Sequence, residues 1–373
     1  MSKETGISWA DSTFNAWEGC TKVGPGCDNC YANTRNNRFH EGKNWGAGAP
    51  RLLRSDKYWK EPLQWEADHE TFFAEHGHRQ RVFCSSLADV FDNEAPAGQR
   101  ERLFELIKAT PRLDWLLLTK RIGNVNSMLP ADHRGDPNSW GCGWANVWLG
   151  ITVVNQEEAD RDIPKLLKIP AAIRFLSMEP LLGAVDLVEA LGMREVGARF
   201  NGWAEIDWVI VGGESGVNAR PMVLGWAKEI VSQCQAAGVP VFMKQLGANP
   251  TNREGKPHLI SDKKGAVLDE WPQALRVQQF PEISAWELLD KGEHKLFTHP
   301  PQPQSVRDAL EKALKAADAE RLRLSAEYKS RLDAGDSRMD GNMDWARLEG
   351  AVSVVSAIRA LIETEGEQNG GAG

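Results

Sequence analysis

From residue 81 onward, short apolar runs alternate with amphipathic segments. Six runs have strand character: Arg81–Ser86, Leu113–Thr119, Val147–Val154, Ile173–Met178, Asp207–Val211 and Val241–Lys244. Helical spacing of apolar residues occurs between them, in Gly98–Ala109, Gln156–Leu167 and Trp226–Ala237. Near-continuous apolar strands separated by helices are typical of a parallel sheet that is buried on both faces. With one more strand expected at Ile7–Ala10, the pattern predicts an α/β fold: an open or closed (β/α) barrel or, as second choice, a doubly wound sheet.

The pattern changes after residue 247. Residues 248–304 are irregular and rich in proline toward their end, which is typical of an insertion followed by a linker. Beyond them, apolar residues recur at intervals of three and four, first from Leu310 to Tyr328 and then from Trp345 to Ile362. We therefore expect three parts: a barrel over 1–247, an insertion and linker over 248–304, and an α-helical hairpin over 305–366.

Composition narrows the class of protein. Apolar residues make up 42% of the 373 positions, charged residues make up 26%, and the net charge is −8. This acidity argues against a large non-specific grip on duplex DNA, although it permits a local basic groove. The chain has no run of 18 apolar residues and no apolar segment of the secretory type near its start, so we expect a cytoplasmic protein that does not cross a membrane.

Three of the six cysteines, Cys20, Cys27 and Cys30, fall within eleven residues. They belong to the segment 17–31, in which Gly24, Pro25 and Gly26 bend the chain. Reduced thiolates so close together favour zinc or an iron–sulfur cluster. A structural zinc ion needs four protein ligands, and His40 and Cys84 are the candidates for a fourth. On a four-iron cluster, three cysteines leave one iron open to a small molecule.

Polar residues stand at the ends of the expected strands. In α/β barrels the carboxyl ends of the strands form the active-site face, so these residues are candidates for binding or catalysis. They are Ser85 and Ser86; Thr119, Lys120 and Arg121; Thr152; Ser177 and Glu179; Gly212, Gly213 and Glu214; and Lys244 and Gln245. The cysteine segment lies on the same face if it connects the first strand to the first helix.

The strings GCTKVGPGCDNCYA, LLLTKR, LSMEPLLG, DWVIVGGESG and GVPVFMKQLG, spread over residues 7–247, together carry a family resemblance. The chain resembles the radical S-adenosylmethionine (SAM) enzymes and, more closely, the phage-associated three-cysteine-motif family. The resemblance implies a partial (β/α) barrel, with SAM and a [4Fe–4S] cluster on Cys20, Cys27 and Cys30. The chain departs from the usual spacing of three and two residues between the cysteines, because here the gaps are six and two. Asn29 also stands where an aromatic residue is usual, and Tyr31 follows the last cysteine.

The resemblance also implies roles for the strand-end residues. Ser85, Ser86 and Asp89 would meet the methionyl amino group of SAM, Thr152 and Asn155 its ribose or carboxylate, and Ser177, Gly212, Gly213 and Glu214 the rest of the cofactor. Glu179 is expected to bind ribose or substrate, and Glu179 and Lys120 are the candidate catalytic residues. The cations Lys120, Arg121, Arg220 and Lys244 would bind a carboxylate or phosphate, or pair with Glu179 and Glu214.

The implied activity is reductive cleavage of SAM to a 5′-deoxyadenosyl radical, with an electron from an external donor. The implied substrate is a nucleobase, such as a modified pyrimidine of phage DNA, that is rearranged or functionalised in the host cytoplasm by an isomerase-type reaction. Trp45, Trp144 and Trp148 could stack on a flipped base. Two alternatives remain: a radical lyase acting on a nucleic-acid lesion, and a non-catalytic, metal-stabilised scaffold whose hairpin docks a partner.

Overall fold

The main sheet is all-parallel, and its strands follow one another in the order of the chain. The computed structural model describes residues 5–130, 140–141, 143–191 and 206–281, all within a compact unit spanning Met1–Gly292. In these ranges, seven strands pair in the order β1-β4-β5-β6-β7-β8-β10. Their bounds are β1 Ser12–Phe14, β4 Arg81–Cys84, β5 Asp114–Thr119, β6 Val147–Thr152, β7 Ile173–Met178, β8 Trp208–Gly212 and β10 Val241–Gln245.

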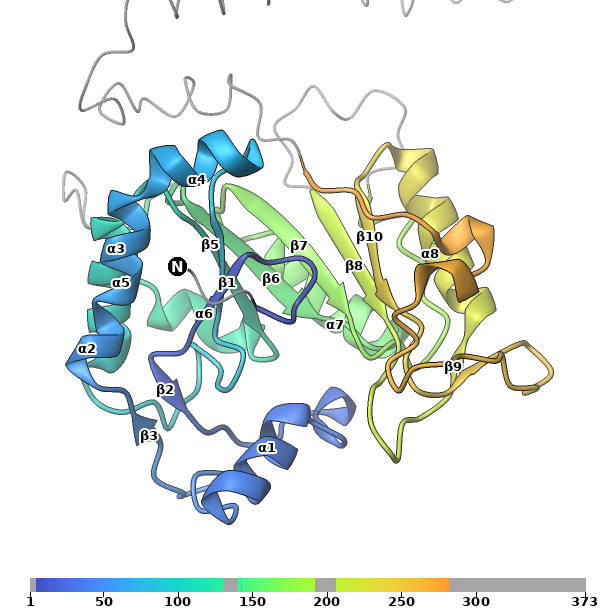
Figure 1. The fold of residues 1–373 in the computed structure, drawn as a ribbon, viewed down its shortest axis with the longest axis horizontal. Helices are drawn as coiled ribbons and strands as arrows, with labels where there is room; N and C mark the ends of the chain where they lie inside the picture. Colours follow the sequence, from blue (N-terminus) through green and yellow to red (C-terminus); the bar gives the residue numbers. More distant parts are fainter. Residues whose placement is uncertain (1–4, 131–139, 142, 192–205, 282–373) are drawn as a thin grey trace, which may run out of the picture. The chain divides into compact units, whose positions relative to one another are not determined.

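This strand order decides between the two predicted architectures. A doubly wound sheet reverses its strand order at a switch point, and no reversal occurs among the described strands. Right-handed crossovers between successive neighbours place the crossover helices on one side of the sheet. The sheet accordingly curls into part of a barrel, with α5, α7 and α8 outside it (Figure 1). The predicted partial barrel is confirmed, and the doubly wound alternative is wrong.

The strand and helix predictions for residues 81–245 agree with the structure to within two residues at each end. The helices in question are α5 Gln99–Ala109, α7 Gln156–Leu166 and α8 Leu224–Ala237. The first strand was misplaced, because β1 is Ser12–Phe14 and the expected Ile7–Ala10 contains a turn. Trp9, only 1% exposed, packs into the barrel interior from that turn, so its apolar character reflects burial rather than a strand.

Further elements complete the described part. Between β1 and β4 lie β2 Trp17–Glu18, the 3-10 helix η1 Pro25–Cys27, α1 Tyr31–His40, β3 Leu52–Leu53, α2 Asp56–Trp59, α3 Glu61–Ala67 and α4 His69–His76. The later elements are α6 Ile122–Met128, β9 Met222–Val223, β11 Pro250–Thr251, η3 Leu268–Glu270 and η4 Gln273–Leu275. In the described part, no helix is both long enough and apolar enough to cross a membrane.

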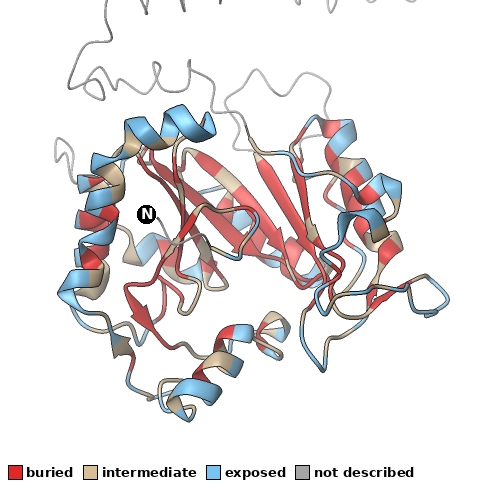
Figure 2. Cartoon of the chain, viewed as in Figure 1, coloured by how far each residue is buried: buried red, intermediate tan, exposed pale blue. Residues whose placement is uncertain are grey.

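Alternation along the strands creates two separate cores. Outward residues such as Val82, Leu117 and Val209 pack with the buried faces of α5, α7 and α8. Inward residues form a second, mainly aromatic cluster: Trp9, Phe83, Leu116, Trp148, Ile173, Phe175, Trp208, Ile210 and Phe242. The strands are therefore buried nearly throughout, while the helices expose their outer faces (Figure 2). Both sides of the sheet are apolar, as the near-continuous apolar runs indicated.

The inward aromatic cluster fills the N-terminal half of the barrel interior. The ring centroids of Trp9 and Phe83 are 4.5 Å apart, and Trp148 meets Trp208 edge-on at 5.9 Å. Gly150 makes room for this packing, since a Cβ there would lie 2.3 Å from the Phe175 ring. The expectation that Trp148 stacks on a base is wrong, because its ring is 1% exposed inside this cluster.

The segment after β10 is irregular in its described part, as expected. Residues 277–279 return beside β10, where the Met243 N–H donates to Val277 O at 2.8 Å and the Gln279 N–H donates to Val241 O at 2.9 Å. This antiparallel contact covers an edge strand that would otherwise expose unpaired backbone groups. The predicted helical hairpin, 305–366, lies outside the described residues.

Candidate functional site

A cavity of about 360 Å³ lies at the carboxyl ends of the parallel strands. It is lined by most of the residues that the sequence analysis singled out: Cys20, Cys27, Cys30, Trp45, Ser85, Ser86, Asp89, Thr119, Lys120, Arg121, Thr152, Ser177, Glu179, Gly213, Glu214, Lys244 and Gln245. Apart from Trp45, these residues come from the cysteine segment and from the ends of β4, β5, β6, β7, β8 and β10. Parallel strands bring their carboxyl ends to one edge, which explains why residues so distant in sequence share one cavity.

Two of the proposed cofactor-binding residues do not line this cavity. Asn155 instead caps α7, where its side chain accepts a hydrogen bond from the Glu158 N–H at 2.9 Å. At Gly212, a Cβ would lie 3.4 Å from the Glu179 side chain. At Gly213, a Cβ would lie 2.2 Å from Leu246 O, so this glycine is required for close packing against the chain that follows β10.

The cysteine segment crosses the mouth of the barrel between β2 and α1. Cys27 ends η1 and is buried, while Cys20 and Cys30 are partly exposed; Cys30 is the residue that caps α1. A Cβ at Gly26 would lie 3.0 Å from Val154 Cγ1 and 3.4 Å from Lys120 Cε. Glycine at this position therefore lets the segment approach the ends of β5 and β6 closely.

Arg220 holds one end of the cysteine segment. Its Nη2 donates to Pro25 O at 2.9 Å and its Nη1 donates to Asp28 Oδ2 at 3.1 Å. Glu214 fixes this guanidinium through Oε1 at 2.6 Å and also accepts a hydrogen bond from Asn29 Nδ2 at 2.8 Å. Burial alone would raise the pKa of Glu214, but the hydrogen bonds from Arg220 and Asn29 outweigh it, and the pKa is lowered. Glu214 thus stays a carboxylate.

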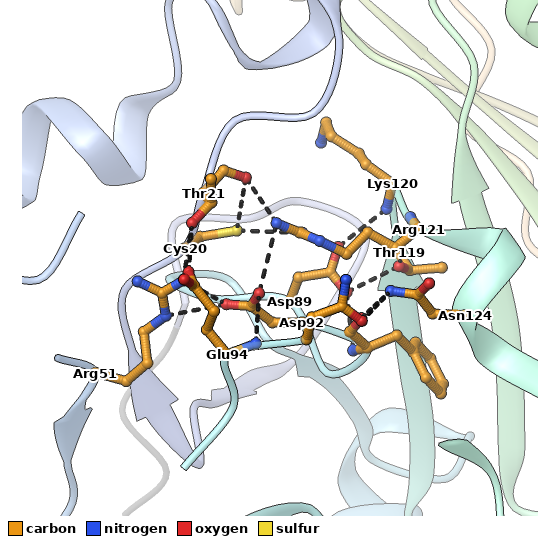
Figure 3. A network of polar contacts seen from close by, with 12 residues as sticks. Cys20, Thr21, Arg51, Asp89, Asp92, Glu94, Thr119, Lys120, Arg121 and Asn124 are labelled. Carbon is orange, nitrogen blue, oxygen red and sulfur yellow. Dashed lines mark hydrogen bonds and ion pairs between the residues drawn. The ribbon is translucent and has the colours of Figure 1, made fainter. Parts of the chain in front are cut away.

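Arg121 holds the other end of the segment (Figure 3). Its Nη1 donates to Cys20 Sγ at 3.3 Å and its Nη2 donates to Thr21 O at 2.7 Å. Burial raises the pKa of the Cys20 thiol to about 11, although the Arg121 guanidinium opposes the increase. The guanidinium charge therefore stabilises the thiolate form of Cys20, but by less than burial destabilises it.

Asp89 supports Arg121 with a fully hydrogen-bonded carboxylate. Oδ1 accepts from the Phe91 N–H at 2.9 Å and from Thr119 Oγ1 at 2.8 Å. Oδ2 accepts from the Lys120 N–H at 3.1 Å and from Arg121 Nη1 at 3.0 Å. These four donors match the lone-pair sites of a carboxylate, so in this arrangement Asp89 orients its neighbours.

Opposite the cysteines, Glu179 and Lys244 form an ion pair. The Lys244 ammonium donates to both carboxylate oxygens, at 2.6 and 2.8 Å. Both side chains remain slightly exposed to the cavity, at 18% and 19%. Lys244 and Arg220 therefore pair with Glu179 and Glu214, as one of the two expectations for the four cations had it. Arg121 pairs instead with Asp89.

Several polar groups that line the cavity lack partners among the described residues. The Thr152 hydroxyl is buried without a hydrogen bond, and so are the indole N–H groups of Trp9 and Trp45. The Lys120 ammonium also makes no hydrogen bond or ion pair within the described ranges. Buried polar groups usually have partners, so this set indicates a site for a polar ligand.

The residues proposed as a fourth zinc ligand are placed elsewhere. Cys84 faces the outer core with 0% exposure, and His40 lies 3.7 Å from the Glu18 carboxylate. Neither lines the cavity. In the described part of the chain, no three His, Cys, Asp or Glu side chains are close enough together to hold one metal ion. Neither His40 nor Cys84 is therefore placed as a fourth ligand beside the three cysteines.

The sequence analysis missed other cavity residues, including Lys22, Lys264 and Tyr31. Tyr31 Oη donates to Ser86 O at 2.5 Å and so ties the start of α1 to the end of β4. It also missed that Arg121 contacts a cysteine, since it expected that cation to bind a carboxylate or phosphate, or to pair with Glu179 and Glu214. No local pattern marks these contacts, because Arg121 and Cys20 are 101 positions apart.

Comparison with known proteins identifies a family. No curated protein matches the chain. Among solved structures it is similar to a spore photoproduct lyase mutant with bound AdoMet and dinucleoside spore photoproduct, at 12% identity and a TM-score of 0.33, over 57% of this chain and 58% of that chain. The same lyase in complex with dinucleoside spore photoproduct matches over the same shares at a TM-score of 0.34. A family model matches residues 4–313, and the chain therefore belongs to the family described as protein of unknown function (DUF5131).

Proposed function

We propose that this protein is a radical SAM enzyme that acts on a nucleobase, with a [4Fe–4S] cluster on Cys20, Cys27 and Cys30. The observation that carries the proposal is that all three thiols line one cavity together with polar side chains from the ends of six strands. Active sites of α/β barrels occupy this face. When bound, the cluster and SAM would supply a 5′-deoxyadenosyl radical at the cavity.

Three cysteine thiolates suit a four-iron cluster. Each thiolate on a four-iron cluster binds a different iron, so the sulfur atoms stand further apart than around one ion. The three cysteines share one cavity. Three cysteines also leave one iron free for the amino and carboxylate groups of SAM.

The unpaired groups around the cavity can bind and orient SAM. The Lys120 and Thr152 side chains lie beside Gly26 of the cysteine segment, and their ammonium and hydroxyl groups can bind a carboxylate or a ribose hydroxyl. Glu179, already paired with Lys244, can accept hydrogen bonds from ribose or substrate hydroxyls. The aromatic cluster closes the barrel below the cavity and excludes water from that side.

A nucleotide substrate suits the charges at the cavity. Lys22, Lys120 and Lys264 line it and provide partners for phosphate groups, whereas Lys244, which also lines it, is paired with Glu179. Trp45 lines it as well and can stack on a base. The net charge of −8 suits a local contact with one nucleotide rather than a long duplex footprint.

The test is anaerobic reconstitution followed by assay. Reconstituted protein should hold about four iron and four sulfide per chain, as a [4Fe–4S] cluster requires. With a one-electron reductant and SAM it should form 5′-deoxyadenosine, and this should increase with DNA or a nucleotide. Mass spectrometry of the nucleosides then distinguishes a rearranged base from a lesion cleaved back to ordinary bases. A single zinc ion without sulfide, or a full cluster that never cleaves SAM, would favour the scaffold alternative.

A further inference from the structure

The contact between Arg121 and Cys20 sets one cysteine apart from the other two. Arg121 Nη1 donates to Cys20 Sγ at 3.3 Å, with no intervening residue (Figure 3). In the described part of the chain, neither the Cys27 nor the Cys30 sulfur accepts a hydrogen bond. A positive charge is therefore directed at one of the three sulfurs and is supplied by the end of β5, outside the cysteine segment.

The Arg121 guanidinium is held in place from three directions. Asp89 Oδ2 accepts from Nη1 at 3.0 Å, Thr21 O accepts from Nη2 at 2.7 Å, and Asp92 Oδ1 lies 3.7 Å from Nη2. The Arg121 backbone N–H also donates to Thr119 Oγ1 at 2.9 Å, and that hydroxyl donates in turn to Asp89. These contacts orient the donor toward the sulfur.

Burial strengthens the effect of this charge. The Arg121 side chain is 7% exposed, as is that of Asp89, so little water screens the interaction. Asp89 and Asp92 offset part of the positive charge, but the N–H group that faces the sulfur still favours additional negative charge there. Hydrogen bonds to the sulfur ligands are among the factors that set the reduction potential of an iron–sulfur centre.

Arg220 provides an internal comparison. It too fixes the cysteine segment, through Pro25 O and Asp28, and it too is paired with a carboxylate. Its guanidinium nevertheless donates to no cysteine sulfur in the described part of the chain. Arg121 therefore both holds the cysteine segment and donates to a sulfur, whereas Arg220 only holds the segment. Substituting each arginine in turn distinguishes the two effects.

Resting on the proposed function, we propose that Arg121 is a positioning residue that raises the reduction potential of the cluster through its N–H to Cys20 Sγ. The cluster gains one electron from an external donor, and this added negative charge is stabilised when an N–H donor faces a ligand sulfur. Loss of that donor should make the cluster harder to reduce without removing any of its ligands.

The experiment is a redox titration of reconstituted full-length protein, monitored by the electron paramagnetic resonance signal of the reduced cluster. Arg121→Gln should lower the ratio of reduced to oxidised cluster about tenfold at a given potential, which is about 59 mV for one electron. Arg121→Lys retains the charge but not the planar fork, and it should give a smaller shift in the same direction. Arg220→Gln should leave the potential unchanged.

An Arg121→Gln protein with a full cluster and the wild-type potential would overturn the inference, as would an equal shift in Arg220→Gln. If Arg121→Gln holds no cluster, Arg121→Lys decides, and a wild-type potential there overturns the inference as well. Wild-type protein that assembles no iron–sulfur cluster would instead overturn the proposed function, so the two failures are distinguishable by iron and sulfide content.

Discussion

The two ends of the barrel interior are built from the same strands and the same inward-facing positions, yet they differ in chemistry. Toward the N-terminal end, Phe83, Trp208 and Phe242 pack among other rings, with exposures between 0% and 6%. Two positions beyond Phe83 and Phe242 stand Ser85, directly after β4, and Lys244 of β10, and both line the cavity. Alternation along a strand thus decides which side chains face inward. Position along the strand decides whether an inward side chain packs in the aromatic core or lines the cavity.

The largest expected effect lies at the cavity end. Cys27→Ala should abolish the iron–sulfur absorbance of reconstituted protein and its bound iron, because two thiolates cannot hold the cluster that three hold. The matched control is Cys234→Ala, since that cysteine is buried in the outer core on α8. Iron content by colorimetric assay provides the measurement, and full iron in the Cys27→Ala protein would falsify the ligand assignment.

At the aromatic end, the effect should be on stability. Trp208 is 0% exposed and contacts Trp9, Trp148 and Phe175, so Trp208→Ala should lower the free energy of unfolding by about 3–5 kcal/mol. Thr152→Val at the cavity end should change it little or raise it, because the lost hydroxyl has no partner. Urea unfolding of the protein without cofactors measures both. Equal losses in the two variants would contradict the division of the interior.

A pH-dependent effect is expected at Asp114, which begins β5 below the aromatic cluster. Burial raises the pKa of Asp114 to about 6, although Arg79, 3.2 Å away, opposes the shift. The folded protein thus binds this proton more tightly than the unfolded chain, whose carboxyl has a pKa of 3.8. The protonated Asp114 carboxyl therefore adds at most about 3 kcal/mol to the free energy of unfolding below about pH 4. This contribution should be lost as the pH rises through 6.

Asp114→Asn isolates this contribution, because the amide does not titrate. The free energy of unfolding of the wild type, minus that of Asp114→Asn, should fall between pH 4 and pH 7. Denaturant unfolding at a series of pH values measures this difference, in which other carboxylates largely cancel. A difference that stays constant across the range would contradict the assignment.

The smallest expected effect concerns ligand binding at Glu179. Glu179→Gln removes the charge that faces the cavity and breaks the ion pair with Lys244, so SAM binding should weaken by about 1–3 kcal/mol. Iron content should be unchanged, because Glu179 is not a proposed cluster ligand. Isothermal titration of SAM into reconstituted protein measures the affinity. Unaltered affinity would remove Glu179 from the proposed SAM site.

Much of the fold followed from local pattern. β7 has the bounds expected for Ile173–Met178, and α5, α7 and α8 begin and end within two residues of expectation. A buried strand leaves an apolar run in the sequence, and an amphipathic helix leaves a periodic pattern. The expected strand at Ile7–Ala10 also rested on an apolar run, and it was wrong. A four-residue apolar run cannot distinguish a strand from a turn that inserts Trp9 into the interior.

The sequence by itself determined the alternation of strands with helices, the spacing of Cys20, Cys27 and Cys30, and the polar residues that follow the strands. Tertiary structure alone decided which of these residues meet. Strand register and the path of the cysteine segment brought Arg121 to Cys20 and Arg220 to Pro25, and they surrounded Asp89 with four donors. Periodicity is a local property of the chain, whereas these contacts join residues up to 195 positions apart and depend on how parallel strands align their ends.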